Sequence, residues 1–311
     1  KENEPMNDNQ LKLEKALSDS PDNVRASLIY GQKLSECSTF KIGGKADCVA
    51  YPRNEEELTA VCNAARQAGV PVFVAGNASN ILFDDSGYRG LVLFTSAMRS
   101  AECRGDRIYT QCGVSLTSVS VLACKNSLSG LEFLYGIPGT VGGGIYMNCG
   151  AFEGQIADVL TCSRYYDPDT GNLVSIDVSE HEFSYRNSCY KGKNRIIVSA
   201  EFKGTPCNDD IRSIMEAYMK KRTDSQPLDM PSAGSVFKRY PGYYTSRLIE
   251  EAGLKGRSVG GAQVSLKHAG FIVNTGNATA ENVKELIEII KEEIYRTNGI
   301  NIECEIIFAP E

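Results

Sequence analysis

The sequence has only two histidines, His181 and His268, among its 311 residues. A histidine-rich metal site is therefore not expected. The sequence also lacks any Cys-x-x-Cys motif, and no cysteine stands at metal-ligand spacing from a histidine. We predict that the protein binds no metal.

Cysteines are present in an odd number and at irregular intervals. The eleven stand at positions 37, 48, 62, 103, 112, 124, 149, 162, 189, 207 and 304. A disulfide framework in a small secreted domain would have an even number of cysteines. Free thiols in a reducing compartment therefore fit this pattern better.

Long runs of one residue class are absent as well. No apolar stretch is long enough to cross a bilayer, and the first thirty residues are polar and acidic, without the hydrophobic centre of a signal peptide. The densest basic cluster is only Lys220-Lys221-Arg222, and the net charge is −6. These features argue against membrane insertion and nucleic-acid binding, and they predict a cytoplasmic protein.

What the sequence has in excess is glycine in one short stretch. Residues 135–150 hold six of the 29 glycines, interleaved with Ile137, Pro138, Val141 and Ile145. A flexible linker would be diluted with serine and charge, whereas this stretch is apolar and stiff. Glycine lets backbone N–H groups approach an anion closely and form a concave nest for phosphate oxygens. The stretch therefore suggests a pyrophosphate site, with a tightly packed structural turn as the alternative.

Two earlier loops could serve the same purpose. One joins Ser38-Thr39 to Gly43-Gly44, and an ordinary hairpin turn would also explain it. The other, Gly76-Asn77-Ala78-Ser79-Asn80, follows a strand-like segment, where α/β sheets place ligands, although a plain connection would also use Gly and Asn. Neither the dinucleotide pattern G-x-G-x-x-G nor the phosphate-loop pattern G-x-x-x-x-G-K-[ST] occurs.

Local patterns predict the helices and strands, and the length suggests two or three domains. Residues 1–26 are polar and are expected to form a poorly anchored, partly helical lead-in. Helices are expected at 54–69, 116–125, from 208, around 248–252 and at 279–299. Strands are expected at 71–75 (buried), 91–94, 107–112, 195–202 and 300–308, with a turn at 165–172. Alternation along the last strand would place Glu303 and Glu305 on one face.

Seven short motifs follow one another between Leu34 and Phe308. They are Ser38-Thr39-Phe40-Lys41-Ile42-Gly43-Gly44, Gly76-Asn77-Ala78-Ser79-Asn80, Gly136-Ile137-Pro138-Gly139-Thr140-Val141-Gly142-Gly143, Met147-Asn148-Cys149-Gly150-Ala151, Tyr185-Arg186-Asn187-Ser188, Ala233-Gly234-Ser235-Val236-Phe237-Lys238 and Lys267-His268-Ala269-Gly270-Phe271-Ile272-Val273-Asn274. In this order the chain resembles the family of bacterial UDP-N-acetylenolpyruvoylglucosamine reductases. Independent structural turns would not recur in one family's order, so the resemblance favours function for these loops.

The resemblance implies an α+β fold: a two-lobed FAD-binding domain of the vanillyl-alcohol-oxidase type, followed by an α+β substrate-binding domain. The expected segments are a lead-in (1–26), a first lobe (27–97), a second lobe (98–205) and a substrate domain (206–311), with a composition change near Thr205-Pro206. The FAD would be bound non-covalently. The residues implied in binding it are Ser38, Thr39, Gly43, Gly44, Gly76, Asn77, Ala78, Ser79, Asn80, Gly136, Pro138, Gly139, Thr140, Gly142, Gly143, Asn148, Gly150, Ala151, Ile196 and Val198.

The resemblance also implies a reaction. NADPH reduces the FAD and leaves, and UDP-N-acetylglucosamine enolpyruvate then accepts the hydride and becomes UDP-N-acetylmuramate, a precursor for peptidoglycan, cell-wall growth, cell shape and division. The implied catalytic residues are Ser235 as proton donor to C2, with Arg186 and Glu305 beside the substrate carboxylate. The implied substrate-binding residues are Tyr185, Arg222, Lys238, Arg239 and His268.

Two positions depart from the family pattern. Ala78 stands where the family usually has glycine, and its methyl group could alter how closely the backbone approaches phosphates. Arg239-Tyr240-Pro241 replaces the Asn-Pro of many members. No segment matches the extra tyrosine-bearing loop of one subclass, so the chain resembles the shorter subclass.

Other functions stay open from the sequence. A sugar, lactone or alcohol oxidoreductase of the same fold often binds flavin covalently through a histidine near the first pyrophosphate loop, but residues 76–80 contain none. A non-catalytic nucleotide-binding protein would bind UDP-sugars without oxidising NADPH. A serine hydrolase built on Ser235 and His268 would lack the G-x-S-x-G elbow.

Overall fold

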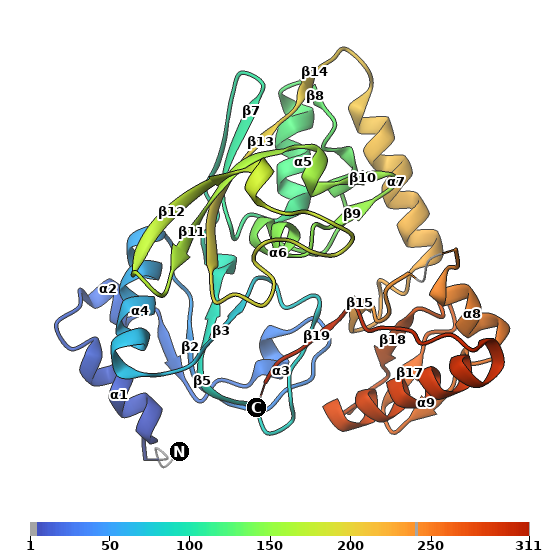
Figure 1. Ribbon diagram of the computed structural model, residues 1–311, viewed down its shortest axis with the longest axis horizontal. Helices are drawn as coiled ribbons and strands as arrows, with labels where there is room; N and C mark the ends of the chain where they lie inside the picture. Colours follow the sequence, from blue (N-terminus) through green and yellow to red (C-terminus); the bar gives the residue numbers. More distant parts are fainter. Residues whose placement is uncertain (1–4, 240–241, 311) are drawn as a thin grey trace. The chain divides into compact units, whose positions relative to one another are not determined.

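The computed structural model describes residues 5–239 and 242–310. The chain forms two compact units (Figure 1). Unit 1 consists of Lys1–Tyr30, Asp47–Asn77 and Gly90–Lys221, and unit 2 of Gly31–Ala46, Ala78–Arg89 and Arg222–Glu311. Two early stretches of the chain thus belong to the same unit as the C-terminal third. The four contiguous segments expected from the sequence stay a prediction of domain boundaries.

Unit 1 is built on two sheets, with strand orders β1-β2-β5-β3 and β12-β11-β13-β7-β6. The strands are β1 Leu28–Tyr30, β2 Ala46–Ala50, β3 Val72–Ala75, β5 Tyr88–Phe94, β6 Ala101–Arg104, β7 Arg107–Gln111, β8 Leu128–Ser129, β9 Gly150–Ala151, β10 Gly154–Gln155, β11 Leu160–Asp167, β12 Asn172–Asp177, β13 Ile196–Lys203 and β14 Thr205–Pro206. The helices are α1 Asp8–Ala16, α2 Asp22–Arg25, α4 Glu55–Ala68, α5 Leu116–Lys125, α6 Val141–Tyr146 and α7 Ile211–Ser225, which runs on into unit 2. Short 3₁₀ helices are η1 Thr95–Ala97, η2 Glu132–Leu134, η3 Ile156–Asp158 and η4 Val178–Glu180.

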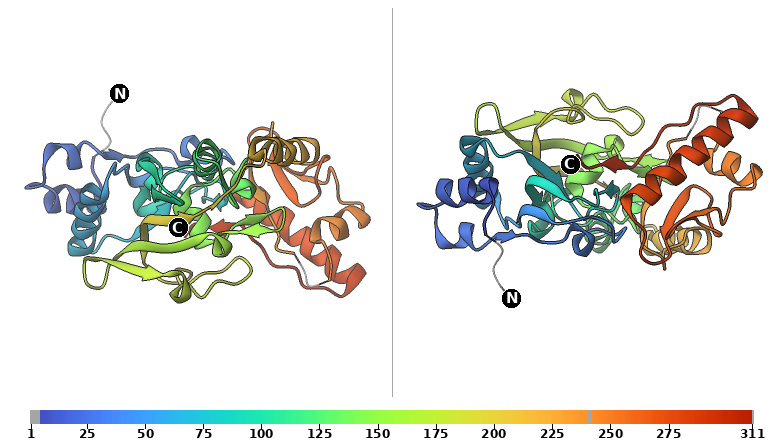
Figure 2. Two further views of the ribbon diagram at one scale, coloured as in Figure 1. Left: turned by 90° about the horizontal axis from the view of Figure 1, so that it is seen from above. Right: turned by 90° about the horizontal axis from the view of Figure 1, so that it is seen from below.

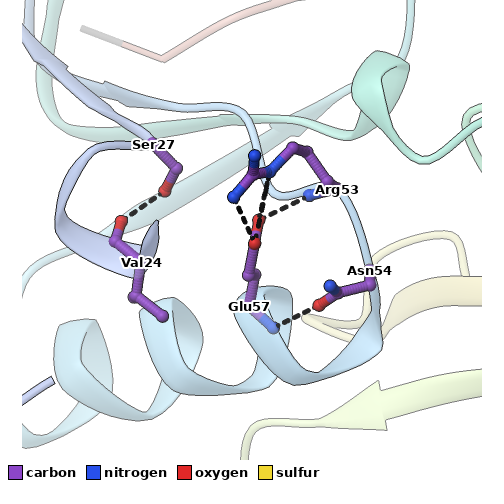
Figure 3. Close-up of polar contacts among 5 residues, drawn as sticks. All are labelled: Val24, Ser27, Arg53, Asn54 and Glu57. Atoms are coloured by element: carbon purple, nitrogen blue, oxygen red, sulfur yellow. Dashed lines mark hydrogen bonds and ion pairs between the residues drawn. The ribbon is translucent and has the colours of Figure 1, made fainter. Parts of the chain in front are cut away.

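Helix α4 begins and ends where the sequence predicts. The Asn54 side chain accepts the N–H of Glu57, and Glu57 is itself buried against Arg53 (Figure 3). Gly69 ends the helix in the left-handed conformation, with φ at 65°. The strand that follows is confirmed as β3, but the prediction that it is buried is wrong. It is the edge strand of its sheet, and Val74 is 37% exposed.

The N-terminal lead-in is anchored over residues 5–26, contrary to the sequence prediction, while residues 1–4 lie outside the described residues. Helices α1 and α2 lie beside α4 (Figure 2), and the Leu13 and Leu17 side chains are buried in the core of unit 1. The amides of Asn7 and Asn9 also donate to the Asp47 carboxylate, at 2.7 and 2.8 Å. The few apolar residues of this polar segment are therefore enough to hold it in place.

The antiparallel sheet β12-β11-β13-β7-β6 supports the glycine-rich stretch. Helix α6 lies inside the stretch, and α5 and α6 both pack against β7 (Figure 1), so the stretch is held over this sheet. The predicted strands at 107–112 and 195–202, the turn at 165–172 and the helix at 116–125 are all confirmed. This arrangement fixes the surroundings of the candidate cofactor loop.

Unit 2 consists of a sheet in the order β15-β18-β17-β16, covered by a long helix. Its elements are α3 Leu34–Cys37, β4 Ile81–Leu82, β15 Ser232–Ser235, α8 Thr245–Glu251, β16 Ser258–Val259, β17 Ala262–Val264, β18 Phe271–Asn274, α9 Ala280–Asn298 and β19 Ile307–Phe308. Helix α9 begins after Thr279 and ends at Gly299, as predicted. Among the described residues of both units, we find no helix with the length and apolar character to cross a membrane.

The predicted strand at 300–308 is wrong over most of its length. Only Ile307–Phe308 forms a strand, β19, which pairs in parallel with β4, while Cys304 makes an isolated bridge to Phe237. Glu303 is exposed and Glu305 is half-buried. The two carboxylates therefore do not share the face of one regular strand.

Helix α9 is capped by a residue from a distant loop. The Asp85 carboxylate accepts the N–H groups of Ala280 and Glu281, at 3.0 and 3.3 Å. A carboxylate at the positive end of a helix is stabilising. We expect Asp85→Ala to lower the free energy of unfolding by about 0.5 to 2 kcal/mol in urea titrations. Asp229→Ala, at an exposed position of the same unit, is the control and should change it little. Equal stabilities for the two variants would contradict the capping role.

The neighbouring Asp84 ties the same loop to α9 through an ion pair. The Lys284 ammonium lies 2.6 Å from its carboxylate and lowers the pKa of Asp84 from 3.8 to about 2. Because the pKa is depressed in the folded protein, this stabilisation is complete above pH 3.8 and is lost as the pH falls toward 2.

Candidate active site

The glycine-rich stretch is an ordered turn that leads into helix α6. Thr140 caps the helix, its hydroxyl accepting the N–H of Gly143 at 3.4 Å. The N–H groups of Val141 and Gly142 donate to the carbonyls of Val114 and Cys112, both at 2.8 Å. The stretch is thus fixed to the end of strand β7, which agrees with the expectation that it is no linker.

Two of the predicted cofactor loops meet within unit 1. A Cβ atom placed on Gly76 would lie only 2.2 Å from the Thr140 hydroxyl oxygen. The end of strand β3 therefore lies directly against the start of helix α6. Only glycine allows this approach, because any side chain would collide with Thr140.

Gly143 is a glycine that the packing of the protein does not require. A Cβ atom on it would have Thr140 Oγ1 as its nearest neighbour, at 3.6 Å, which is an ordinary contact distance. Glycine inside a helix costs roughly 1 kcal/mol relative to alanine, so a glycine without a packing reason suggests another role. A Cβ on Gly144, in contrast, would crowd Leu116 and Cys149 at 3.0 and 3.1 Å. Gly143 is itself exposed, so the space beside it is open and would admit a side chain.

Arg186 lies at the tip of a tight turn. Ser184 and Asn187 exchange both backbone hydrogen bonds, so Tyr185 and Arg186 are the two central residues. Arg186 has a φ of 54°, an unusual conformation for a residue with a long side chain, and its guanidinium lies over the Tyr185 ring at 5.2 Å. Tyr185 is half-exposed. The turn therefore presents both predicted residues at the surface of unit 1.

The Arg186 turn is fastened to the end of helix α6. The Asn148 amide donates to the Ser184 carbonyl at 3.1 Å, and the Ser188 hydroxyl donates to the Tyr146 carbonyl at 2.9 Å. Asn148 is buried, and its carbonyl oxygen also accepts the N–H of Ala157. The side chain of this predicted cofactor residue is therefore engaged with the protein.

The remaining predicted cofactor residues of unit 1 lie nearby in the fold. Gly150 and Ala151 form β9, where a Cβ on Gly150 would lie 2.5 Å from the Gly154 carbonyl oxygen. Ile196 and Val198 are both buried in β13. Gly136 donates its N–H to the Thr117 hydroxyl at 3.1 Å. Pro138 and Gly139 complete the same turn, and Asn77 is exposed at the boundary of the unit.

Ser235 and Glu305 are brought together within unit 2, although 70 residues separate them in the sequence. The backbone N–H of Glu305 donates to the carbonyl of Val236, next to Ser235, at 2.7 Å. The Asn80 amide donates to the Glu305 carbonyl at 3.2 Å. Ser235 ends β15 after an irregular step at Gly234, and its hydroxyl donates to the Phe237 carbonyl at 3.3 Å.

The loop at 38–44 packs against two other parts of unit 2. The Thr39 hydroxyl donates to the Ser232 carbonyl at 2.7 Å, and the Ser38 hydroxyl donates to the Ile42 carbonyl. A Cβ on Gly43 would lie 2.7 Å from the Phe83 Cβ, and one on Gly44 would lie 2.2 Å from the Asp85 carbonyl oxygen. Close packing accounts for both glycines.

Ala78 adopts a conformation that glycine adopts more easily. Its φ is 47°, in the left-handed region, and its methyl group is buried. The family's usual glycine at this position therefore has a backbone reason. Ser79, the next predicted cofactor residue, is half-buried, and its carbonyl oxygen would lie 3.9 Å from a Cβ on Gly234.

Three of the predicted substrate-binding side chains have partners in unit 2. Lys238 forms an ion pair with Glu303 at 2.6 Å, and the Arg239 guanidinium lies over the Tyr244 ring at 5.1 Å. His268 Nδ1 accepts the N–H of Gly270, and burial lowers the pKa of this imidazole, so it is neutral near pH 7. The departure at 239–241 includes Tyr240 and Pro241, which lie outside the described residues.

Arg222, another predicted substrate-binding residue, lies in helix α7 and is only 8% exposed.

In the part of the chain that the structure describes, no group of three or more His, Cys, Asp or Glu side chains could hold a metal ion. The cysteines of this part are free thiols.

The sequence reasoning missed a buried polar cluster beneath the Arg186 turn. It consists of Ser163, His181 and Tyr190, all within unit 1. The sequence held one sign of this cluster: His181 is one of only two histidines in the chain, and it stands five residues before Arg186.

Comparisons with known proteins agree with the resemblance found in the sequence. Residues 46–177 match the family model of an FAD binding domain, and residues 226–309 match that of the UDP-N-acetylenolpyruvoylglucosamine reductase C-terminal domain. The UDP-N-acetylenolpyruvoylglucosamine reductase of Caldicellulosiruptor saccharolyticus is 40% identical over 97% of this chain and 96% of its own length. That of Syntrophomonas wolfei is 43% identical over 88% of this chain and 92% of its own length. The chain belongs to the UDP-N-acetylenolpyruvoylglucosamine reductase family.

A solved structure of this family supports the fold as well. The reductase from Thermus caldophilus matches with a TM-score of 0.78 at 32% identity, covering 91% of this chain and 98% of that one. The predicted family and the predicted α+β, FAD-binding fold class are therefore confirmed. The roles of individual site residues stay predictions.

Proposed function

We propose that this protein reduces the enolpyruvyl ether of UDP-N-acetylglucosamine to UDP-N-acetylmuramate, with NADPH as co-substrate and non-covalently bound FAD. The observation that carries the proposal is the similarity to named reductases along almost the whole chain, which includes both the flavin domain and the C-terminal domain. The reaction makes a peptidoglycan precursor, so the proposal places the protein in the cytoplasm and in cell-wall synthesis.

The residues of unit 1 fit the phosphates of FAD. Gly76 allows β3 to touch Thr140, and the space beside the exposed Gly143 is open. The N–H groups of Val141, Gly142 and Gly143 already donate within the protein, so the proposed fit rests on this space and not on those N–H groups. In unit 2, Thr39, Ser79 and the other predicted residues of loops 38–44 and 78–80 would contribute. FAD, when bound, carries the hydride between NADPH and the enol ether.

The chain's own side chains would handle the charge and the proton of the substrate. Arg186 would neutralise the substrate carboxylate, and the turn at 184–187 holds this residue before substrate arrives. Ser235 would supply the proton to C2, and Glu305 lies on the neighbouring backbone segment. Tyr185, Arg222, Lys238, Arg239 and His268 would contact the rest of the nucleotide sugar. Lys238 and His268 would then have to share or exchange their present partners.

A direct experiment can test this function. The purified protein should be yellow, NADPH should bleach it under anaerobic conditions, and the enolpyruvyl nucleotide should restore the colour. Acid precipitation should release all of the flavin into solution. A yellow pellet would favour a covalent flavin oxidase, and bleaching that the enolpyruvyl nucleotide does not reverse would overturn the proposed substrate.

Arg186 provides a sharper test of the site. We expect Arg186→Ala to slow the recovery of colour with the enolpyruvyl substrate by about 100- to 1,000-fold, because only this step builds negative charge at the carboxylate. Bleaching by NADPH should stay within about twofold of the wild-type rate, as it involves no such charge. Arg104→Ala, at an exposed position of edge strand β6, is the control. Equal slowing of both steps would make the role of Arg186 structural.

A further inference from the structure

The polar cluster beneath the Arg186 turn is completely buried. Ser163 lies on β11, with its hydroxyl oxygen 2.7 Å from His181 Nε2 and 2.6 Å from the Tyr190 hydroxyl. His181 Nδ1 lies 2.8 Å from the Asp177 carbonyl oxygen. Side-chain polar groups with almost no exposure are costly unless each has a partner, and this cluster supplies one for each.

For a neutral imidazole, the distances allow one assignment of the protons. A carbonyl oxygen only accepts, so His181 Nδ1 carries the hydrogen that faces Asp177, and Nε2 is left as an acceptor. The Ser163 hydroxyl then donates to Nε2, and the Tyr190 hydroxyl donates to Ser163. This order requires a neutral imidazole, and burial lowers the pKa of His181 accordingly.

Two members of the cluster bracket the segment that carries Arg186. His181 precedes the segment and Tyr190 follows it, and the N–H of Cys189 donates to the His181 carbonyl at 2.6 Å to close its base. Arg186 itself has a φ of 54°, a strained conformation for a residue other than glycine, which persists only where the surroundings hold it. The ring contacts of His181 with Phe183 and Tyr190 add to this support.

We propose that Ser163, His181 and Tyr190 are positioning residues for Arg186, acting through the segment 182–189. The proposal rests on the proposed function, in which Arg186 meets the substrate carboxylate. The cluster fixes the base of the segment, while Asn148 and Ser188 fix its sides. A guanidinium displaced by about 1 Å loses on the order of 100-fold in rate, so this distant support matters for the reaction.

Tyr190→Phe removes one hydroxyl and keeps the ring. We expect backbone amides in 182–189 to exchange with deuterium about 10-fold faster, because the local opening becomes easier. The recovery of flavin colour with the enolpyruvyl nucleotide should slow by about 10- to 100-fold, with bleaching by NADPH and FAD content unchanged. Tyr166→Phe, which removes a buried hydroxyl from the same strand as Ser163 but bonded to Asn63, is the matched control and should do neither.

His181 offers a test by conservative rescue. Glutamine can place an acceptor oxygen near the position of Nε2, whereas leucine cannot. We therefore expect His181→Gln to keep the exchange rate of 182–189 and the recovery step closer to wild type than His181→Leu. In a double variant, Tyr190→Phe should add little to the slowing caused by Arg186→Ala, because both act on the same contact.

These measurements distinguish a failure of the positioning role from a failure of the proposed function. An active wild-type enzyme in which Tyr190→Phe leaves both the exchange of 182–189 and the recovery step unchanged would overturn the positioning role alone. Faster exchange without slower recovery would also overturn it, as would additive effects in the double variant. A wild-type enzyme that the enolpyruvyl nucleotide does not reoxidise would overturn the proposed function itself, together with the link between this cluster and the reaction.

Discussion

Replacing Ser235 by alanine is expected to slow reoxidation of the reduced enzyme by the enolpyruvyl nucleotide by about 100- to 10,000-fold, the usual contribution of a general acid. The hydroxyl makes a long hydrogen bond of 3.3 Å to the Phe237 carbonyl, so its loss costs the fold little. FAD content and bleaching by NADPH should therefore stay near wild type. Stopped-flow absorbance after anaerobic reduction separates the two steps.

Two further variants make the Ser235 experiment specific. Ser235→Cys keeps an acidic proton on a longer bond and should recover part of the lost rate. Ser232→Ala, at the start of the same strand, should change little. The hydrogen bond from the Thr39 hydroxyl goes to the backbone carbonyl of Ser232, which this substitution keeps. Reoxidation of Ser235→Ala at the wild-type rate would mean that the proton comes from water or another residue.

Gly143→Val is expected to abolish FAD binding while leaving the protein folded. Within the protein, a Cβ at this position meets Thr140 Oγ1 at an acceptable 3.6 Å, so the fold tolerates the branched side chain, which would occupy the open space proposed for the phosphates. The purified variant should be colourless and should gain no flavin on incubation with excess FAD, with the far-ultraviolet circular dichroism of the wild type.

Gly144→Val is the matched control in the same helix. Its side chain would collide with Leu116 and Cys149, so we expect it to destabilise unit 1. Overpacking of this kind costs roughly 1 to 3 kcal/mol, which chemical denaturation can measure. Stoichiometric FAD in Gly143→Val would show that the phosphates lie elsewhere.

The helices were predictable because their signals are local. Asn54 and Gly69 bracket α4, and Thr279 and Gly299 bracket α9, each within a turn of the residues that they cap. Capping bonds and apolar periodicity act over three or four residues, so a short window of sequence contains all the information.

The failed predictions depend on distant partners. Residues 5–26 of the lead-in are anchored because Leu13 and Leu17 pack into a core formed by α4 and the sheet. The side-chain amides of Asn7 and Asn9 also donate to the Asp47 carboxylate. Strand β3 is only partly buried because it stands at the edge of its sheet. Residues 300–306 pass beside Phe237 and Val236 without forming a regular strand. No local pattern distinguishes these cases.

The sequence by itself determined the family and the order of the loops, because seven motifs of four to eight residues follow one another along the chain in that family's order. Only the tertiary structure decided which of these residues come together. It joins Gly76 to Thr140, Asn148 to the Arg186 turn, and Ser235 to Glu305. It also assigns residues 31–46 and 78–89 to the unit of the C-terminal third. Contacts across such separations depend on which faces pack, and that choice is made by the whole chain at once.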